Sequence, residues 1–218
     1  MTAPQSDEMQ LRAGLVRVMK KMAASGLNRG TSGNASVRFG DGILVTPSGI
    51  VPDLLDEDSI VEVAADGTTS PGAKRPSSEW RMHQRILEKR PDMNAVVHCH
   101  SRHATILACS HKPIAAIHYM VGVTGGTEVP VAPYEVFGTS ELADTVVASL
   151  DGRLACLMAN HGQIALGRNL DHAYALAEEV EEQAAVYYGT LLIGEPHILS
   201  DDQMAEIFNQ FRGYGQKR

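Results

Sequence analysis

Hydrophobic residues near the start of the chain recur at the spacing of one helix face. Asp7 and Gln10 are three residues apart and can cap the first turn, and Gly26 can end the helix. The spacing therefore predicts an amphipathic helix between these positions, whose buried face consists of Leu11, Leu15, Val18, Met19 and Met22.

After Gly26 the pattern changes to short alternating runs between turn residues. It predicts a hairpin of residues 36–39 and 43–46 joined at Asp41-Gly42, which is a common hairpin turn. A second hairpin is expected around Asn160-His161-Gly162. The remaining predicted strands cover residues 60–63, 95–100, 114–119 and 128–131, and the second hairpin covers 154–158 and 163–166.

Helical patterns lie between these strands. Ser77 or Ser78 can cap a helix that runs to about residue 89, Asp171 a long helix to about 193, and Ser200 the last one. Residues 101–110 and 140–150 also have helical spacing. Helices that alternate with hairpin-joined strands favour an α/β sandwich with a largely antiparallel sheet over a doubly wound parallel one.

Composition narrows the class of protein. The 218 residues carry a formal net charge of -7, which argues against nucleic-acid binding through bulk positive charge. Three cysteines without a CxxC pair indicate a reducing cytoplasm, and no apolar run approaches the roughly 20 residues that cross a bilayer. The absence of GxGxxG, Walker A, HExxH and GxSxG motifs weighs against several common enzyme classes.

The sharpest chemical signal among the nine histidines is His98-Cys99-His100. On a strand, residues i and i+2 point to the same face, so the two imidazoles can share a cation while Cys99 points to the other layer. His161 in its tight turn can supply a third imidazole, and Glu79 stands at a helix start. Each has an ordinary alternative, because His161 can be a turn residue and Glu79 part of a cap. We expect the other six histidines, including His83, to be surface or packing residues.

Three clusters of small polar residues precede the histidine pair. Backbone N–H groups in glycine turns and at a helix N-terminus bind anions without a fixed positive charge. Together with Glu79, the clusters suit a phosphorylated substrate beside a metal. They are Thr31-Ser32-Gly33-Asn34, Thr46-Pro47-Ser48-Gly49 and Pro76-Ser77-Ser78.

These residues lie in long ordered blocks that resemble the class II aldolase/adducin family almost from end to end. The blocks are GLNRGTSGNASVR, ILVTPSGI, KRPSSEWRMH, RPDMNAVVHCH, PIAAIHYM, VPVAPYEVFGT and NHGQIALG. The resemblance implies one domain over residues 1–218, built as a three-layer sandwich with a central, largely antiparallel sheet flanked by helices. It also implies a metal-dependent aldehyde-lyase.

The resemblance implies a role for each matching residue. Zn²⁺, with Mn²⁺ or Co²⁺ as alternatives, would be held by His98, His100, His161 and Glu79. Dihydroxyacetone phosphate would displace Glu79, which then acts as the base toward carbon. The substrate phosphate would lie on Thr31, Gly33, Asn34, Ser48, Gly49, Ser77 and Ser78.

The resemblance also implies an assembly. Tyr119 matches a proton donor that reaches in from the next subunit of a homotetramer, so active sites would lie at subunit interfaces. Tyr214 matches a residue of a mobile C-terminal tail, from about residue 207, that closes the site. No nucleic acid or membrane partner is expected.

The implied reaction is reversible cleavage of a ketose 1-phosphate to dihydroxyacetone phosphate and an aldehyde. L-Fuculose 1-phosphate and the 5-deoxy- and 5-methylthioribulose 1-phosphates are the candidate substrates. Residues 121–124 and Asn160 depart from the family pattern for the fucose sugar, which favours a less polar aldehyde. Pentulose-phosphate 4-epimerases, methylthioribulose-1-phosphate dehydratases and non-catalytic adducin-like modules are the alternatives. Residues 101–105 resemble the epimerases, but those enzymes carry Asp in place of Glu79.

Overall fold

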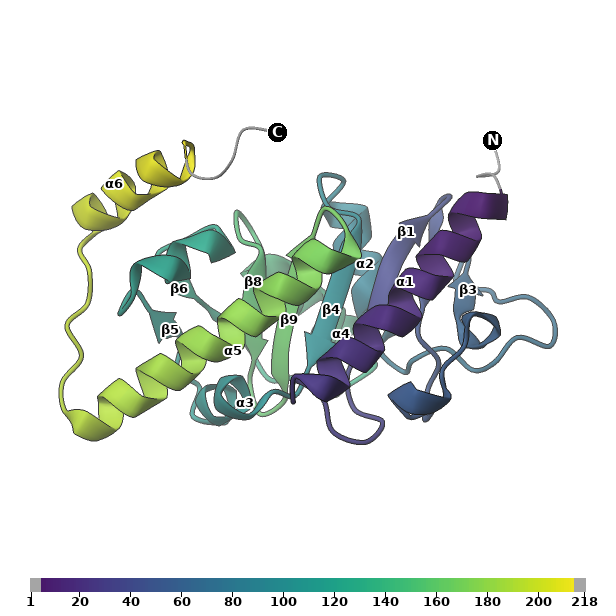
Figure 1. Cartoon of the computed structure of the whole chain (residues 1–218), viewed down its shortest axis with the longest axis horizontal. Coiled ribbons are helices and arrows are strands. Elements are labelled where there is room, and N and C mark those ends of the chain that lie inside the picture. The colour runs from purple at the N-terminus through teal and green to yellow at the C-terminus, as the bar shows by residue number, and fades with distance from the viewer. Residues whose placement is uncertain (1–4, 214–218) are drawn as a thin grey trace.

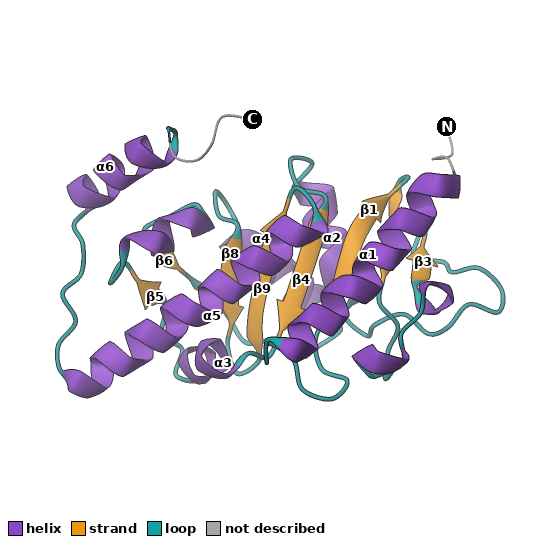
Figure 2. Cartoon of the chain, in the orientation of Figure 1, coloured by secondary structure: helices purple, strands orange, loops and turns teal. Residues whose placement is uncertain are grey.

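A seven-stranded sheet forms the centre of the molecule, and the computed structural model describes residues 5–213 (Figures 1 and 2). Its order is β3-β2-β1-β4-β9-β8-β7, and every neighbouring pair is antiparallel except β7 and β8. β5 and β6 form a separate antiparallel pair. The strands are β1 (Asn34–Phe39), β2 (Gly42–Val45), β3 (Val61–Val63), β4 (Ala95–Cys99), β5 (Ile114–Ala115), β6 (Glu128–Val129), β7 (Val131–Ala132), β8 (Ala155–Met158) and β9 (Gly162–Gly167).

Helices cover both faces of this sheet. Figure 1 shows α1 and α5 crossing one face, with α2 and α4 behind the strands, so the predicted three-layer sandwich is confirmed. The helices are α1 (Gln5–Ala24), α2 (Trp80–Lys89), α3 (Arg102–Cys109), α4 (Ser140–Ser149), α5 (Leu170–Ile193) and α6 (Asp201–Phe211). Short 3-10 turns lie at η1 (Pro52–Leu54), η2 (Glu57–Ser59) and η3 (Tyr119–Thr124).

The alternation of side chains in β4 and β9 produces two apolar layers. Val97 and Cys99 face the core under α1 and α5, whereas Val96 faces the core under α2 and α4. The same alternation in β9 places Ala165 in the first core and Ile164 in the second. His98 therefore points toward the α2 layer, and Cys99 points away from it as predicted.

Several predicted boundaries are wrong. The first hairpin turns at Gly40-Asp41, because Phe39 pairs with Gly42 and Gly40 takes a left-handed φ of 53°. α1 begins at Gln5, before the proposed cap at Asp7. A strand of residues 114–119 is also wrong, since β5 stops at Ala115 and Tyr119 begins η3.

Two predicted caps are also wrong, and one is confirmed. Asn169 caps α5 by accepting from the N–H of His172, while Asp171 lies in the first turn. Glu79 occupies the N-cap position of α2, so neither Ser77 nor Ser78 is the cap residue. Ser200 caps α6 in a reciprocal box with Gln203, as predicted.

α6 stands apart from the main sheet and packs on η3 (Figure 1). Met204 is buried there, and the terminal methyl group of its side chain lies close to Gly122 of η3. Among residues 5–213, none of the helices combines the length and the apolar composition needed to cross a membrane.

Candidate metal centre

His98 and His100 lie side by side where β4 ends. Their Nε2 atoms are 3.1 Å apart, as the strand period predicts. His98 is fully buried, and its Nδ1 donates to the carbonyl oxygen of Gln163 on β9 at 2.8 Å. This hydrogen bond places the proton on Nδ1 and leaves the Nε2 lone pair of His98 directed into the site.

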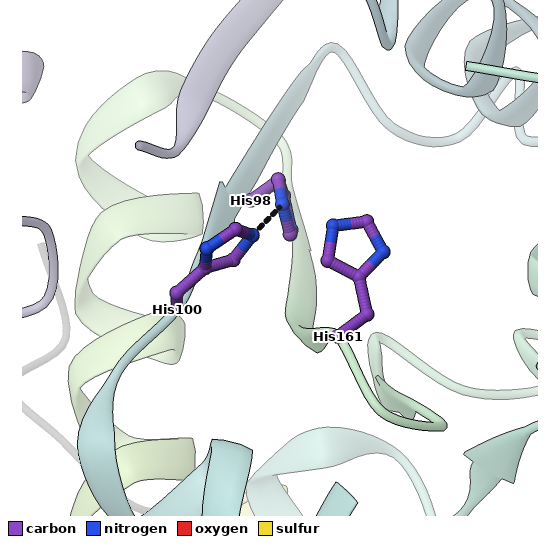
Figure 3. A group of neighbouring side chains, drawn as sticks. All are labelled: His98, His100 and His161. Atoms are coloured by element: carbon purple, nitrogen blue, oxygen red, sulfur yellow. Dashed lines mark hydrogen bonds between the residues drawn. The ribbon is translucent and has the colours of Figure 1, made fainter. Parts of the chain in front are cut away.

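His161 joins them from the turn between β8 and β9 (Figure 3). Its ring centroid lies 4.8 Å from that of His98 and 5.0 Å from that of His100. The candidate ligand nitrogens of the three histidines all lie within 4.8 Å of one another. Asn160 reaches this turn through a left-handed φ of 54°, which asparagine tolerates well.

Gly162 follows His161 in a space that excludes a larger side chain. A Cβ at this position would lie 2.5 Å from the carbonyl oxygen of Cys99 and 3.0 Å from Cδ2 of His100. The close approach of β9 to the end of β4 therefore requires a glycine here, and it sets the positions of two histidines at once.

Glu79 completes the group from the start of α2. Its backbone occupies the N-cap position, but its side chain makes no capping hydrogen bond. The alternative that the Glu79 carboxylate caps α2 is therefore wrong. Instead Oε2 lies 3.2 Å from Nε2 of His98, and Oε1 lies 3.2 Å from Nε2 of His161. The residue is only 6% exposed, so its carboxylate is removed from bulk water.

The pKa values favour an ionised carboxylate facing neutral imidazoles. Burial alone raises the pKa of Glu79, but His98, His161 and a hydrogen bond from Asn34 outweigh it and lower that pKa to about 2. Burial lowers the pKa of His161 to about 4, and burial also lowers the pKa of His98 and His100. Metal binding at neutral pH would therefore need no deprotonation of these groups.

The donor set suits a divalent cation. Three imidazole nitrogens and a carboxylate are the ligand types that zinc takes in catalytic sites. Oε1 of Glu79 is buried and has no hydrogen-bond partner within residues 5–213, although it faces His161 at 3.2 Å. A buried carboxylate oxygen without a hydrogen bond is costly, and a cation between it and the rings would satisfy it.

A buried side-chain network lies behind Glu79, and sequence reasoning missed it. Asn34 Nδ2 donates to Glu79 Oε2 at 2.9 Å, and Asn34 Oδ1 lies 2.5 Å from Nε2 of His83. Nδ1 of His83 lies 2.8 Å from the hydroxyl of Ser36. The signals were the four-residue spacing of Glu79 and His83 on α2 and the two-residue spacing of Asn34 and Ser36 on β1.

The sheet register explains how Asn34 reaches the site. Asn34 on β1 is the direct partner of His98 on β4, so the two residues lie side by side. The family resemblance implied only one role for Asn34, a contact with the substrate phosphate. The structure shows that its amide contacts the carboxylate of Glu79.

Backbone hydrogen bonds join the second polar cluster to the third and to the strand that follows the first. Ser48 N donates to the carbonyl of Arg75, and Ser77 N donates to the carbonyl of Thr46, both at 2.9 Å. Thr46 N in turn donates to the carbonyl of Ala35, which follows the first cluster on β1, at 3.1 Å, and the Ala35 N–H donates to the Thr46 hydroxyl at 3.2 Å. Ser48, Gly49, Ser77 and Ser78 are thus near one another, next to Glu79, and Gly33 adjoins Asn34 at the start of β1.

The two proposed tyrosines are placed differently. Tyr119 is 49% exposed on η3, and its ring lies 4.6 Å from His118 and 6.3 Å from Phe211, centroid to centroid. It makes no side-chain hydrogen bond to any residue from 5 to 213. Tyr214 lies outside the described residues.

The chain is similar to known proteins over most of its length. The family model "Class II Aldolase and Adducin N-terminal domain" matches residues 13–188, well over half of the chain. A 5-methylthioribulose-1-phosphate/5-deoxyribulose-1-phosphate aldolase of Rhodospirillum rubrum is 47% identical over 205 residues, which cover 94% of this chain and 92% of the relative. The L-fuculose phosphate aldolase of Escherichia coli strain K12 is 44% identical over 207 residues, 94% of this chain and 96% of that protein.

A solved structure shares the whole architecture. It is an L-fuculose 1-phosphate aldolase with a TM-score of 0.90 and 37% sequence identity, and the match covers 97% of this chain and 98% of that one.

Proposed function

The chain belongs to the class II aldolase and adducin family, and on this premise we propose that it is a metal-dependent aldolase. It would cleave a ketose 1-phosphate reversibly to dihydroxyacetone phosphate and an aldehyde. The observation that carries the proposal is the convergence of the Glu79 carboxylate with three histidine rings, at 3.2 Å from two of them.

We propose Zn²⁺ as the resident ion, with Mn²⁺ or Co²⁺ as alternatives. His98, His100, His161 and Glu79 would hold it. When bound, the ion would act as a Lewis acid that stabilises the negative charge left on the dihydroxyacetone phosphate half. Nitrogen ligands favour zinc over the harder cations, which prefer oxygen.

Two protons must move in this reaction. In the cleavage direction the C4 hydroxyl loses a proton, the C3–C4 bond breaks, and its electron pair remains on C3 as part of an enediolate. In the condensation direction the ionised Glu79 would remove a proton from C3. In the cleavage direction the same carboxyl group, after taking up a proton from solvent, would give it to C3. Because the Glu79 side chain is only 6% exposed, this proton transfer would take place away from bulk water.

Tyr119 would handle the proton on the C4 oxygen from a neighbouring subunit. Its exposed ring on η3 and its lack of a hydrogen bond to a described residue support a role across an interface. We propose a homotetramer with sites between subunits. The large exposed side chains of Tyr134, Phe137 and Ile193 are suited to such contacts.

The substrate phosphate would bind where the three polar clusters meet, on Thr31, Gly33, Asn34, Ser48, Gly49, Ser77 and Ser78. The backbone hydrogen bonds that join the clusters support this assignment, because they hold several N–H and hydroxyl donors beside the start of α2. Local dipoles of this kind bind phosphate without a lysine or arginine. An acidic chain can therefore still take an anionic substrate.

A further part of the proposal concerns the half of the substrate that is released as the aldehyde. We propose a less polar tail, as in 5-deoxy- or 5-methylthioribulose 1-phosphate, and a place in the salvage of nucleoside by-products. The apolar η3 segment, with buried Val121, and the first relative's printed name support it. L-Fuculose 1-phosphate is the alternative, supported by the second relative.

One set of assays tests these proposals. The zinc-loaded enzyme is incubated with each of the three phosphates, and release of dihydroxyacetone phosphate is coupled to its reduction. Release with an aldehyde supports the aldolase, whereas an isomeric pentulose phosphate or loss of water would instead show an epimerase or a dehydratase. The three kcat/KM values rank the substrates, and a clear preference for L-fuculose 1-phosphate would refute the less polar tail.

We also propose a cytoplasmic location and a single domain whose tail, from about residue 207, closes the site. Free cysteines at positions 99, 109 and 156 support the reducing compartment. The structure describes α6 as far as Phe211, and Tyr214 stays a prediction.

A further inference from the structure

The carboxylate of Glu79 stands at the end of an unbroken buried chain of side chains. From the interior outward the chain is Ser36, His83, Asn34 and Glu79, with contacts of 2.8, 2.5 and 2.9 Å. Ser36 and His83 are fully buried, and Asn34 and Glu79 are each 6% exposed. Asn34 and Ser36 come from β1, which pairs with β4, whereas His83 lies on α2 and Glu79 at its N-cap.

The positions of the protons in this row of four side chains follow from the ionised carboxylate of Glu79 at one end. An ionised carboxylate can only accept hydrogen bonds, so the atom of Asn34 that faces Glu79 must be the amide nitrogen. The amide oxygen of Asn34 then faces His83, and Nε2 of His83 must carry a proton to donate to it. Nδ1 of a neutral imidazole is then an acceptor, which receives the hydroxyl proton of Ser36.

The two oxygens of Glu79 are consequently unequal. Oε2 accepts the hydrogen bond from Asn34, whereas Oε1 has no hydrogen bond within the described residues and faces His161.

We propose that His83 is a positioning residue for Glu79. It holds the amide of Asn34 with the nitrogen toward the carboxylate, and Ser36 fixes the tautomer of His83. This inference rests on the proposed function for the catalytic role of Glu79, but the tautomer of His83 and the orientation of Asn34 are properties of the folded chain alone.

The alternative orientation of Asn34 shows why a positioning group is needed. If the amide were turned over, its oxygen would face the carboxylate, and two acceptors would repel each other in a site without bulk water. A donor on the far side of Asn34 adds to the carboxylate in opposing that turn. His83 Nε2 is the described donor within hydrogen-bond distance of Asn34 Oδ1.

The first test uses the metal-free wild-type protein labelled with ¹⁵N. Long-range ¹H–¹⁵N correlation spectra give the tautomer of each imidazole, and His83 is assigned by its loss in His83→Gln. We expect the neutral form protonated on Nε2 at neutral pH, with loss of this fixed tautomer in Ser36→Ala. A proton on Nδ1 of His83 in the wild-type protein would overturn the inference.

The second test compares two substitutions at one position. His83→Leu removes the donor, whereas the side-chain amide of His83→Gln can still donate to Asn34. We expect His83→Leu to weaken zinc binding about 10- to 100-fold in a competition titration with a chromophoric chelator, and to lower kcat more than it raises KM. His83→Gln should recover most of both losses.

Controls separate this inference from the proposed activity. His172→Gln replaces an exposed histidine at the start of α5 and should keep wild-type zinc affinity. Where His83→Leu fails to fold, Ser36→Ala takes its place. Wild-type zinc affinity and kcat in a folded His83→Leu protein would overturn the inference while the aldolase activity stands. If no ketose 1-phosphate is cleaved but zinc affinity depends on His83, the proposed function fails and the positioning role is retained.

Discussion

Protonation of His83 should couple the stability of the fold to pH. The folded environment lowers the pKa of His83 from 6.5 to about 3, chiefly because the ring is completely buried and its charged form loses hydration. In the unfolded chain the same ring keeps its ordinary pKa. Between these two values the unfolded state binds a proton that the folded state does not bind.

The sign and size of the effect follow from this difference. Falling pH favours the state that binds more protons, so the stabilisation is present above pH 6.5 and is lost as pH falls toward 3. Each pH unit within the window is worth about 1.4 kcal/mol for one proton. Between about pH 7 and pH 5 the contribution of His83 to the free energy of unfolding should thus fall by about 2 kcal/mol.

The measurement compares metal-free wild-type protein with His83→Gln, which cannot titrate. Urea unfolding of both proteins across this range gives the free energy of unfolding at each pH. Working above pH 5 keeps the carboxylate of Glu79 out of the comparison, because its titration lies at or below 4.5. The other buried histidines affect both proteins alike, so the difference in slope belongs to His83.

We expect the wild-type protein to lose about 2 kcal/mol more than His83→Gln over the two pH units. The comparison uses slopes, so a general loss of stability in the variant does not affect it. Equal losses in the two proteins would refute the argument, since they would mean that a proton reaches His83 in the folded state as readily as in the unfolded chain.

Three further outcomes test the site. Glu79→Gln should keep the circular dichroism spectrum and lose turnover by about 10²- to 10⁴-fold, and wild-type turnover would exclude its role in proton transfer. Tyr119→Phe should lower kcat by a similar factor. If Tyr119 acts across subunits, oligomers that combine Tyr119→Phe and Glu79→Gln subunits should regain activity. If such mixed oligomers form but regain none, Tyr119 acts within its own subunit. Gly162→Ala would put a methyl group 2.5 Å from the Cys99 carbonyl and 3.0 Å from the His100 ring, so it should weaken zinc binding and destabilise the protein by about 1–3 kcal/mol, as measured by chelator competition and urea unfolding. Unchanged zinc affinity in that variant would show that the turn can shift without moving His100.

The parts of the site that depend on local periodicity could be predicted from the sequence. The strand period brings the rings of His98 and His100 together, and the structure confirms it. Boundaries depend on single backbone conformations, so the turn at Gly40-Asp41 and the cap at Asn169 were missed by one or two residues. Asn169 and Asp171 are equally good caps by composition, and only the path of the chain decides between them.

The role of His83 could not be predicted by the same means. Its partners Asn34 and Ser36 lie far away in the sequence, and they reach it only because β1 pairs with β4 while α2 packs across that pair. A histidine on a helix has no pattern that separates a packing residue from one that orients a catalytic group. The distinction is visible only in the direction of its two ring nitrogens.

The arrangement of elements separates two tasks of the site. The sheet holds His98 and the Asn34 contact, since Asn34 and His98 are register partners and His98 is hydrogen-bonded to Gln163 on the next strand. Of the residues proposed to meet the aldehyde, those on η3 lie outside the sheet, whereas Asn160 directly precedes His161 in its turn. Changes on η3 can therefore alter the proposed contacts with the aldehyde without moving the strands that position His98 and Asn34. Relatives whose names specify different sugar phosphates at 44% and 47% identity to this chain are what such a division would produce.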